Sequence, residues 1–312
     1  MYMRGFAPGR SASICHASHN SMEIIHTIAE LRQHRPTLGK LALVPTMGAL
    51  HAGHLSLITE AKKRAPKVVV SIFVNPTQFG PREDFSKYPR PIMTDLEKCR
   101  AAGVDMVFHP DEAEMYPANS PEVLVDLPQL TSVLEGKHRP GHFRGVCQVV
   151  AKLFNLIEPQ IACFGQKDFQ QLRVLTAMTA ALNWPIEIVG CPTLRDPDGL
   201  AMSSRNVYLS PAERQKALSI PKALTTAQEL AATGVKQASR LITTMQHLLL
   251  AQHLSIDYIA AVDPINLKPV EVMTGPTVLA IAARVGATRL IDNAVVGEGA
   301  EAKPEIRNPK SE

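Results

Sequence analysis

Residues 41–54 read Leu-Ala-Leu-Val-Pro-Thr-Met-Gly-Ala-Leu-His-Ala-Gly-His, and this stretch decides the fold. Its first part, Leu41–Val44, has the length and apolar character of a buried strand, and residues 49–64 repeat apolar positions with helical spacing. The HxGH motif of His51 and His54 therefore lies where a strand turns into a helix. A helix start attracts anions through its unpaired N–H groups and its macrodipole, and side chains three residues apart share one face. The motif predicts contact with the phosphates of a nucleotide such as ATP.

An HxGH pattern alone also fits a purely structural interpretation. His51 would then satisfy backbone groups in the first turn of the helix, and Gly53 would allow the helix to pack closely on the sheet. Other parts of the chain have to decide between the two interpretations.

Composition limits the class of protein. The chain has 312 residues, of which 45% are hydrophobic, enough for one large domain and a smaller one. The formal net charge is only +4, and no basic run is interleaved with aromatic residues, so we expect no nucleic-acid partner. The strongest apolar run, Val68–Val74, is far shorter than the ~20 residues needed to span a bilayer, so we expect no membrane partner.

The cysteines are consistent with a reducing compartment. The five cysteines are widely spaced and form no CxxC pair: Cys15, Cys99, Cys147, Cys163 and Cys191. This pattern argues against a zinc knuckle or a disulfide framework. Residues 1–20 lack the apolar core of a secretory signal, so we expect a disordered extension, with an organellar transit peptide as the alternative. We also expect a disordered tail over 298–312.

Strand-like and helix-like segments alternate over 21–193, which predicts a parallel sheet with helices on both faces. The expected strands are 41–44, 68–74, 104–108, 161–164 and 186–189, and the expected helices are 49–64, 91–102, 144–157 and 168–182. The predicted class is α/β, with a Rossmann-like doubly wound domain. Ligands bind such sheets at the carboxyl ends of the strands.

The pattern changes after residue 193. Ser210 and Glu213 form a capping box, with Pro211 at the first helical position of a helix over 211–232. A second helix over 236–252 and three strands at 256–262, 278–282 and 289–291 follow. We expect a smaller α+β lid domain over 194–297.

Two further segments have the chemistry of a phosphate site. Gly165-Gln166-Lys167-Asp168 follows a strand and opens a helix, so Lys167 would neutralise charge on a phosphate. In the loop 196–206, Ser203 and Ser204 can donate to phosphate oxygens, and Arg205 offers a planar fork of donors. The structural alternatives are an exposed lysine beside an Asp168 helix cap, and a polar linker.

Amide side chains supply candidates for binding a small hydroxy acid. Asn75 and Gln78 follow the strand 68–74, and Gln170 and Gln171 lie on the helix 168–182. Buried glutamines are more often satisfied structural side chains. We interpret Tyr88 and the turn 139–144 as structural in the first instance.

Six motifs in order resemble the pantothenate synthetases over about residues 22–293. They are PTMGALHAGH, VSIFVNPTQF, YPR, RPGHFRGV, FGQKDFQQL and DGLAMSSRN. The resemblance implies a cytoplasmic homodimer that condenses pantoate with β-alanine and converts ATP, with Mg²⁺, to AMP and pyrophosphate. Pantoate would first form pantoyl adenylate, and the amine of β-alanine would then displace AMP. In this family HxGH and the serine-rich loop correspond to the ATP signatures of class I aminoacyl-tRNA synthetases.

Matched position by position, the resemblance implies roles for single residues. His54 is the expected catalytic histidine, and His51 and Lys167 assist it around the phosphates. Gln78 and Gln171 would contact pantoate, with β-alanine also near Gln78, and no metal ligands beyond ATP itself are expected. The residues expected at ATP are Met47, Gly48, Ala49, Leu50, His51, Ala52, Gly53, His54, Gly165, Gln166, Lys167, Asp168, Leu194, Met202, Ser203, Ser204 and Arg205.

Two positions depart from the family pattern. Gln166 stands where glutamate is usual and removes a negative charge near the expected phosphate site. Thr77 stands where methionine is usual and would change the wall of the pantoate pocket. We therefore expect an active enzyme with shifted substrate constants.

Two other functions compete with this interpretation. Another transferase or ligase of the same fold, such as a cytidylyltransferase or a synthetase-like fragment, would keep HxGH and the serine-rich loop but use a different acceptor. Asn75, Gln78, Gln171 and the turn 139–144 favour pantoate as the acceptor. A regulatory module would bind ATP without forming AMP, and the presence of all the central polar residues argues against it.

Overall fold

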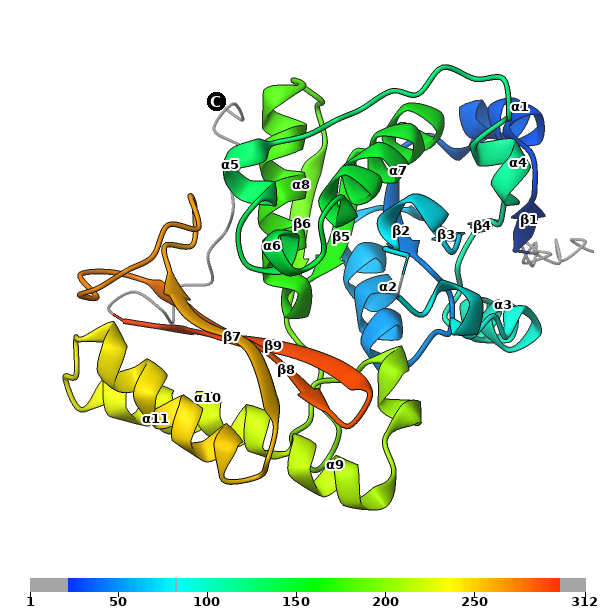
Figure 1. The fold of residues 1–312 in the computed structure, drawn as a ribbon. Helices are drawn as coiled ribbons and strands as arrows, with labels where there is room; N and C mark the ends of the chain where they lie inside the picture. Colours follow the sequence, from blue (N-terminus) through cyan, green and yellow to red (C-terminus); the bar gives the residue numbers. More distant parts are fainter. Residues whose placement is uncertain (1–21, 82, 298–312) are drawn as a thin grey trace, which may run out of the picture.

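The computed structural model describes residues 22–81 and 83–297, and the two segments expected to be disordered, 1–20 and 298–312, lie outside the described residues. The described chain forms two lobes, each built on its own sheet (Figure 1). Within these residues no helix is both long and apolar enough to cross a membrane.

The larger lobe is built on a six-stranded sheet in the order β1-β4-β3-β2-β5-β6. Every neighbouring pair is parallel. The strands are β1 (Glu23–Ile25), β2 (Leu41–Thr46), β3 (Lys67–Ile72), β4 (Met106–Phe108), β5 (Ile161–Gly165) and β6 (Glu187–Cys191). The strand order reverses between β2 and β5, because the chain proceeds outward on one side of β2 and then returns to its other side. The Rossmann-like doubly wound sheet predicted from the sequence is confirmed.

Helices cover both faces of this sheet, and the alternation of side chains along β2 shows why. Leu41 and Leu43 enter the core beneath α1, α7 and α8, whereas Ala42 and Val44 enter the core beneath α2 and α3. The long helices of this lobe are α1 (Ile28–Leu38), α2 (Ala52–Arg64), α3 (Ile92–Ala101), α7 (His142–Ile157) and α8 (Phe169–Ala181). Short helices between them are η1 (Pro76–Gln78), η2 (Phe85–Lys87), α4 (Glu112–Met115), α5 (Pro128–Thr131), α6 (Glu135–His138) and η3 (Gln166–Asp168).

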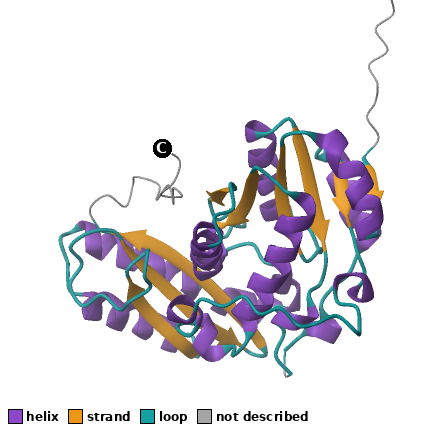
Figure 2. Cartoon of the chain, turned by 90° about the horizontal axis from the view of Figure 1, so that it is seen from above, coloured by secondary structure: helices purple, strands orange, loops and turns teal. Residues whose placement is uncertain are grey.

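The smaller lobe contains an antiparallel sheet in the order β7-β8-β9. Its elements are η4 (Ser204–Tyr208), α9 (Pro211–Ala217), α10 (Ser219–Ala232), α11 (Ala238–Leu250), β7 (Ser255–Val262), β8 (Thr277–Val285) and β9 (Thr288–Val296). Leu279 and Ile281 of β8 face α10 and α11, whereas Val278 and Ala280 join the core of the larger lobe. The sheet is therefore shared between the two lobes (Figure 2). We infer that the lobes divide near residue 194, after β6.

Three local differences from the sequence-based expectation have simple causes. β1 and α1 were not predicted, because β1 has three residues and α1 buries only Leu31 completely. The expected helix 211–232 is two helices, since Pro221 lacks the N–H that would continue the ladder from α9 and so lies in the first turn of α10. The helix after β2 begins at Ala52 rather than at residue 49.

The turn between β2 and α2 is held by a buried carboxylate from α3. Asp95 is 1% exposed, and its two oxygens accept from the backbone N–H groups of Ala49 and Leu50 at 2.8 and 2.7 Å. One helical turn further along, Lys98 donates to the carbonyl of Leu50 at 2.5 Å. Gly48 has a φ of +81°, and a Cβ at this position would meet Asp95 at 3.0 Å. These contacts delay the start of α2 and fix the direction in which HxGH leaves the sheet.

We predict that Asp95→Ala lowers the free energy of unfolding by about 3 kcal/mol, because the buried N–H of Leu50 and the half-buried N–H of Ala49 lose their acceptor. Urea denaturation followed by circular dichroism measures this loss. Glu97→Ala is the matched control, since Glu97 is exposed on the same helix. Equal stability of the two variants would contradict the role given to Asp95.

Candidate functional site

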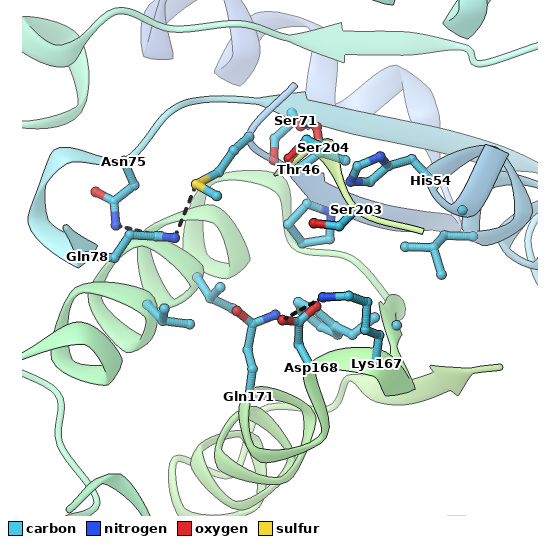
Figure 3. A pocket seen from close by; sticks show the side chains of 18 of the residues that line it. Thr46, His54, Ser71, Asn75, Gln78, Lys167, Asp168, Gln171, Ser203 and Ser204 are labelled. Atoms are coloured by element: carbon cyan, nitrogen blue, oxygen red, sulfur yellow. Dashed lines mark hydrogen bonds and ion pairs between the residues drawn. The ribbon is translucent and has the colours of Figure 1, made fainter. Parts of the chain in front are cut away.

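A cavity of about 240 Å³ lies at the carboxyl ends of β2, β3 and β5, beside the reversal of strand order. Parallel sheets bind ligands at this position. Side chains from the helices and from the loop before η4 line it (Figure 3). Most of the expected site residues line it: Met47, His51, Gly53, His54, Asn75, Gln78, Gly165, Lys167, Asp168, Gln171, Leu194, Met202, Ser203, Ser204 and Arg205.

Five residues expected at ATP do not line this cavity: Gly48, Ala49, Leu50, Ala52 and Gln166. The first three form the turn held by Asp95, and the N–H groups of Ala49 and Leu50 are already bound. Ala52 is exposed. The amide of Gln166 donates to the carbonyl of Gly190 on β6 at 3.4 Å, so this departure from the family pattern acts away from the cavity wall.

The two histidines of HxGH both cap backbone N–H groups at the start of α2. Nδ1 of His51 accepts from the N–H of Gly53 at 3.1 Å, and Nδ1 of His54 accepts from the N–H of His51 at 3.3 Å. A nitrogen that accepts carries no proton, so each neutral ring holds its proton on Nε2. Because both rings line the cavity, the motif provides it with two Nε2–H donors.

Both imidazoles are held neutral. Burial lowers the pKa of His54 to about 3, aided by the neighbouring His51 and Lys167. Burial, followed by the charge of Lys167, also lowers the pKa of His51. In the unfolded chain the pKa of His54 has its usual value of 6.5, so protonation is easier there than in the folded protein. The neutral ring therefore contributes to stability above pH 6.5, and this contribution is lost as the pH falls toward 3. The rings therefore act as neutral hydrogen-bond donors at neutral pH.

The helix-capping interpretation of His51 is confirmed by the bond from Gly53 to Nδ1, and this bond does not exclude the site interpretation, because Nε2 is left for the cavity that the ring lines. Gly53 does not serve close packing of the helix on the sheet. A Cβ at Gly53 would meet the ring of His51 at 2.8 Å and Cβ of Met202 at 3.7 Å. Glycine here leaves room for the imidazole and for the loop above it.

Cationic and hydroxyl groups face the histidines from two other segments. Lys167, at the end of β5, has only a loose pairing with Asp168, at 4.0 Å. Ser203 and Ser204 reach the cavity from the smaller lobe, and the hydroxyl of Ser204 lies 3.1 Å from that of Tyr88. Arg205 is already engaged, because its guanidinium makes two hydrogen bonds to Asp84 at 3.0 and 2.8 Å. A phosphate has to compete with that carboxylate for Arg205.

The opposite part of the cavity carries amides (Figure 3). Gln78 is 8% exposed; its oxygen accepts from Asn75 at 3.1 Å, and its nitrogen donates to the sulfur of Met47 at 3.1 Å. Because a thioether is a weak acceptor, this N–H is available to a better one. Asn75 is fully used: it also donates to the carbonyl of Gly145 and accepts from Thr77 and Tyr116. Asn75 therefore orients Gln78 and has no group left for a ligand.

The neighbouring glutamines of α8 separate into two roles. Gln170 is buried and bonded to the carbonyls of Leu130 and Val133 and to the N–H of Glu135, so it is structural. Gln171 lines the cavity. Thr77, expected in the pocket wall, is exposed outside the cavity and acts on it only through its bond to Asn75.

Several side chains at the site were not among the residues expected there, including Arg139 and His142 of the turn interpreted as structural. Ser71 on β3 lines the cavity, and its buried hydroxyl has no hydrogen-bond partner among the described residues. Tyr88 lines the cavity as well, and Asp84 holds Arg205. The sequence carries a signal for Ser71, a hydroxyl inside the apolar strand Val70-Ser71-Ile72, and for Tyr88, which belongs to the YPR motif.

Chemically, the cavity presents neutral N–H donors, one loosely paired cation and amides, with no nucleophile activated by a base. Residues 22–81 and 83–297 contain no group of three or more histidine, cysteine, aspartate or glutamate side chains that could hold a metal ion. Among these residues, Asp168 is the one carboxylate on the cavity wall. The donors and the loosely paired Lys167 suit an anionic ligand.

We predict that His54 keeps its Nε2–H tautomer and stays unprotonated from pH 8 down to pH 5. Two-bond ¹⁵N–¹H correlation spectra of protein labelled at histidine report the tautomer and its titration directly. A short histidine peptide in the same buffers provides the reference titration. A midpoint for His54 above pH 5 would contradict the geometry described for the capping pair.

Comparison with known proteins identifies the family. The family model described as pantoate-beta-alanine ligase matches residues 23–295. The pantothenate synthetase of Geobacter sulfurreducens is 50% identical over 89% of this chain and 99% of its own length. The bifunctional pantoate ligase/cytidylate kinase of Gloeobacter violaceus is 52% identical over 91% of this chain, which spans 56% of that longer protein.

Solved structures agree with these relatives. A pantothenate synthetase from Thermus thermophilus superposes with a TM-score of 0.84 at 46% identity, covering 87% of this chain and 98% of that one. A pantoate-beta-alanine ligase from Francisella tularensis, complexed with β-γ ATP and β-alanine, has a TM-score of 0.73 at 32% identity, covering 88% and 97%. With its fold, its cavity and its motifs in agreement, this chain belongs to the pantoate-beta-alanine ligase family.

Proposed function

We propose that this protein condenses pantoate with β-alanine at the expense of ATP, through pantoyl adenylate, releasing AMP and pyrophosphate. The observation that carries the proposal is the cavity itself, where HxGH, Lys167 and the serine-rich loop face the amides of Gln78 and Gln171. Phosphate-binding groups and groups suited to a hydroxy acid thus share one small space.

In the first half-reaction, a carboxylate oxygen of pantoate attacks the α-phosphorus of ATP, and the bond to the pyrophosphate oxygen breaks. Both partners are anions, so the protein has to position them and offset their charge. The Nε2–H groups of His51 and His54 donate to phosphate oxygens, with His54 nearest the reacting phosphate, and Lys167 supplies positive charge. No covalent bond to the protein is needed.

The amides select the acid. Gln78 offers the N–H that otherwise contacts the sulfur of Met47, and Asn75 holds it in that orientation. Gln171 offers a second amide from α8. Amides bind a hydroxyl and a carboxylate without adding net charge. In the second half-reaction the amine of β-alanine, bound near Gln78, attacks the acyl carbon, loses a proton and displaces AMP.

The serine-rich loop shields the adenylate from water. Met202 lies against Gly53, and Ser204 lies against Tyr88. Arg205 reaches the phosphates when its pairing with Asp84 exchanges for pairing with ATP. An acyl adenylate hydrolyses in water, so exclusion of solvent preserves it for the amine.

Three further proposals concern the surroundings of the enzyme. Mg²⁺ accompanies ATP and offsets charge on its phosphates, with Asp168 as the nearest carboxylate on the cavity wall. The protein works as a homodimer, associated through its N-terminal lobe. It works in the cytoplasm, an inference supported by the free thiols of Cys99, Cys147, Cys163 and Cys191.

We predict that His54→Ala and Lys167→Ala each slow pyrophosphate release by about 10²–10³-fold, because each removes a donor or a charge from the phosphate site. The assay contains purified protein, ATP, Mg²⁺ and pantoate, with β-alanine present or absent, and mass spectrometry identifies the products. Lys137→Ala is the matched control, as Lys137 is exposed on α6.

Each outcome of this assay has a distinct meaning. Pantothenate and AMP formed only when both acids are present establish the reaction. Near-normal pyrophosphate release from either variant removes the role given to that residue. If pantoate stimulates no pyrophosphate release from the unmodified protein, the acceptor is wrong and other carboxylates replace it in the same assay.

We predict a dimer mass in multi-angle light scattering at the protein concentration of the assay. The proposal of a dimer rests on family membership. The mass of the unmodified protein tests it directly, and no variant is needed. A monomer mass across that concentration range would refute the dimer.

A further inference from the structure

Asn293 links the smaller lobe to the backbone of the phosphate site. It lies on β9, and its amide nitrogen donates to two successive carbonyls of η3, those of Gln166 at 3.0 Å and Lys167 at 2.8 Å. An amide nitrogen has two hydrogens, so one side chain satisfies both bonds. The short helix η3 has no side-chain cap of its own. A contact from the other lobe therefore helps to set the position of Lys167.

Asp292, the residue before Asn293, holds the second segment proposed to contact the phosphates, which is the hairpin leading to Ser203. Asp292 is 4% exposed and accepts from the two terminal nitrogens of Arg195 at 2.6 and 3.1 Å. Arg195 in turn donates to the carbonyl of Gly199, and the backbones of Arg195 and Ala201 form a bridge. This small hairpin leads directly to Ser203. Asp292 also accepts from the backbone N–H of Asn293 at 2.8 Å, which couples the two contacts.

Two adjacent side chains of one strand thus contact the two segments that enclose the phosphates. Asn293 contacts the segment of Lys167, and Asp292 contacts the hairpin that carries the serine-rich loop. The strand β9 is paired along its whole length with β8, so it forms a stiff reference for both segments.

We propose that Asn293 is a positioning residue for adenylate formation, which holds Lys167 at the correct place relative to the serine-rich loop. The inference rests on the proposed function and adds to it a residue that lies outside all six family motifs. It acts through Lys167, so its effect belongs to the half-reaction that needs charge on the phosphates and not to the transfer of the acyl group to the amine.

The test compares the two half-reactions in Asn293→Ala. We expect the rate constant for pyrophosphate release at saturating ATP and pantoate to fall by about 10–10²-fold, since small displacements of catalytic groups are costly. With chemically prepared pantoyl adenylate and β-alanine, we expect the rate of pantothenate formation to stay within about twofold of the unmodified protein. Equal loss in both half-reactions would show a general structural defect and overturn the proposal.

A double-mutant cycle with Lys167 makes the test specific. If Asn293 acts through Lys167, then Asn293→Ala causes no further loss in a Lys167→Ala background. If the loss of rate in the double variant equals the product of the losses in the two single variants, the proposal is overturned. Asn293→Asp keeps the shape but replaces the donating nitrogen by an acceptor, so it should lose as much activity as Asn293→Ala, and normal activity of this variant would also overturn the proposal.

Controls separate this inference from folding and from the proposed function. Asn119→Ala is the matched control, because Asn119 is exposed in the loop after α4. Thermal unfolding monitored by circular dichroism identifies which variants are folded, and Asn293→Asp carries the test if Asn293→Ala is not. An unmodified protein that fails to release pyrophosphate with pantoate would refute the proposed function, whereas an active protein with a fully active Asn293→Ala variant would refute this inference alone.

Discussion

The pairing of β2 with β5 is the constraint on which the rest of the structure depends. The two strands are parallel neighbours, but the chain reaches β5 only after passing through β3 and β4 on the other side of β2. Helix α2 leaves β2 over one face of the sheet, and α8 leaves β5 over the other. Their first turns diverge, and the side chains that follow both strands, from Met47 on one and Lys167 on the other, face a common cavity.

Structure and chemistry share the same atoms in the HxGH turn. Each imidazole uses Nδ1 to cap backbone N–H groups and keeps Nε2–H for the cavity. The cap fixes the tautomer, and burial keeps the rings neutral. Because the first N–H groups of the turn are taken by Asp95 and by the rings themselves, the cavity receives donors from side chains here rather than from the backbone. This differs from a glycine-rich phosphate loop, in which the backbone itself contacts the ligand.

The site belongs to both lobes, with ionic contacts that cross between them. Arg289 of β9 pairs with the buried Glu135 of α6, which also accepts from the hydroxyl of Tyr258. Arg205 pairs with Asp84, and Asn293 supports the backbone of Lys167. Such contacts exchange partners more readily than packed apolar surfaces do, so they suit a cavity that has to admit ATP and two acids in turn. The apolar part of the interface, formed by Val278 and Ala280, keeps the lobes together while these contacts exchange partners.

Local pattern was sufficient for the elements that bury a regular face and for the motifs that adjoin them. Apolar periodicity and turn chemistry, which act over a few residues, predicted strands at 41–44 and 161–164, where β2 and β5 lie, and the helices α7 and α8 to within a few residues. They also singled out the segments carrying His54, Lys167 and Ser203. Hydrogen-bond partners distant in the chain were decided only by the tertiary structure. Asp95 accepts from the N–H groups of Ala49 and Leu50. All the hydrogen-bonding groups of Asn75 are bonded, one of them to Gln78. Gln170 is buried, whereas Gln171 lines the cavity. Each outcome depends on which side chain arrives from another element, and that is information that spacing along the chain does not contain.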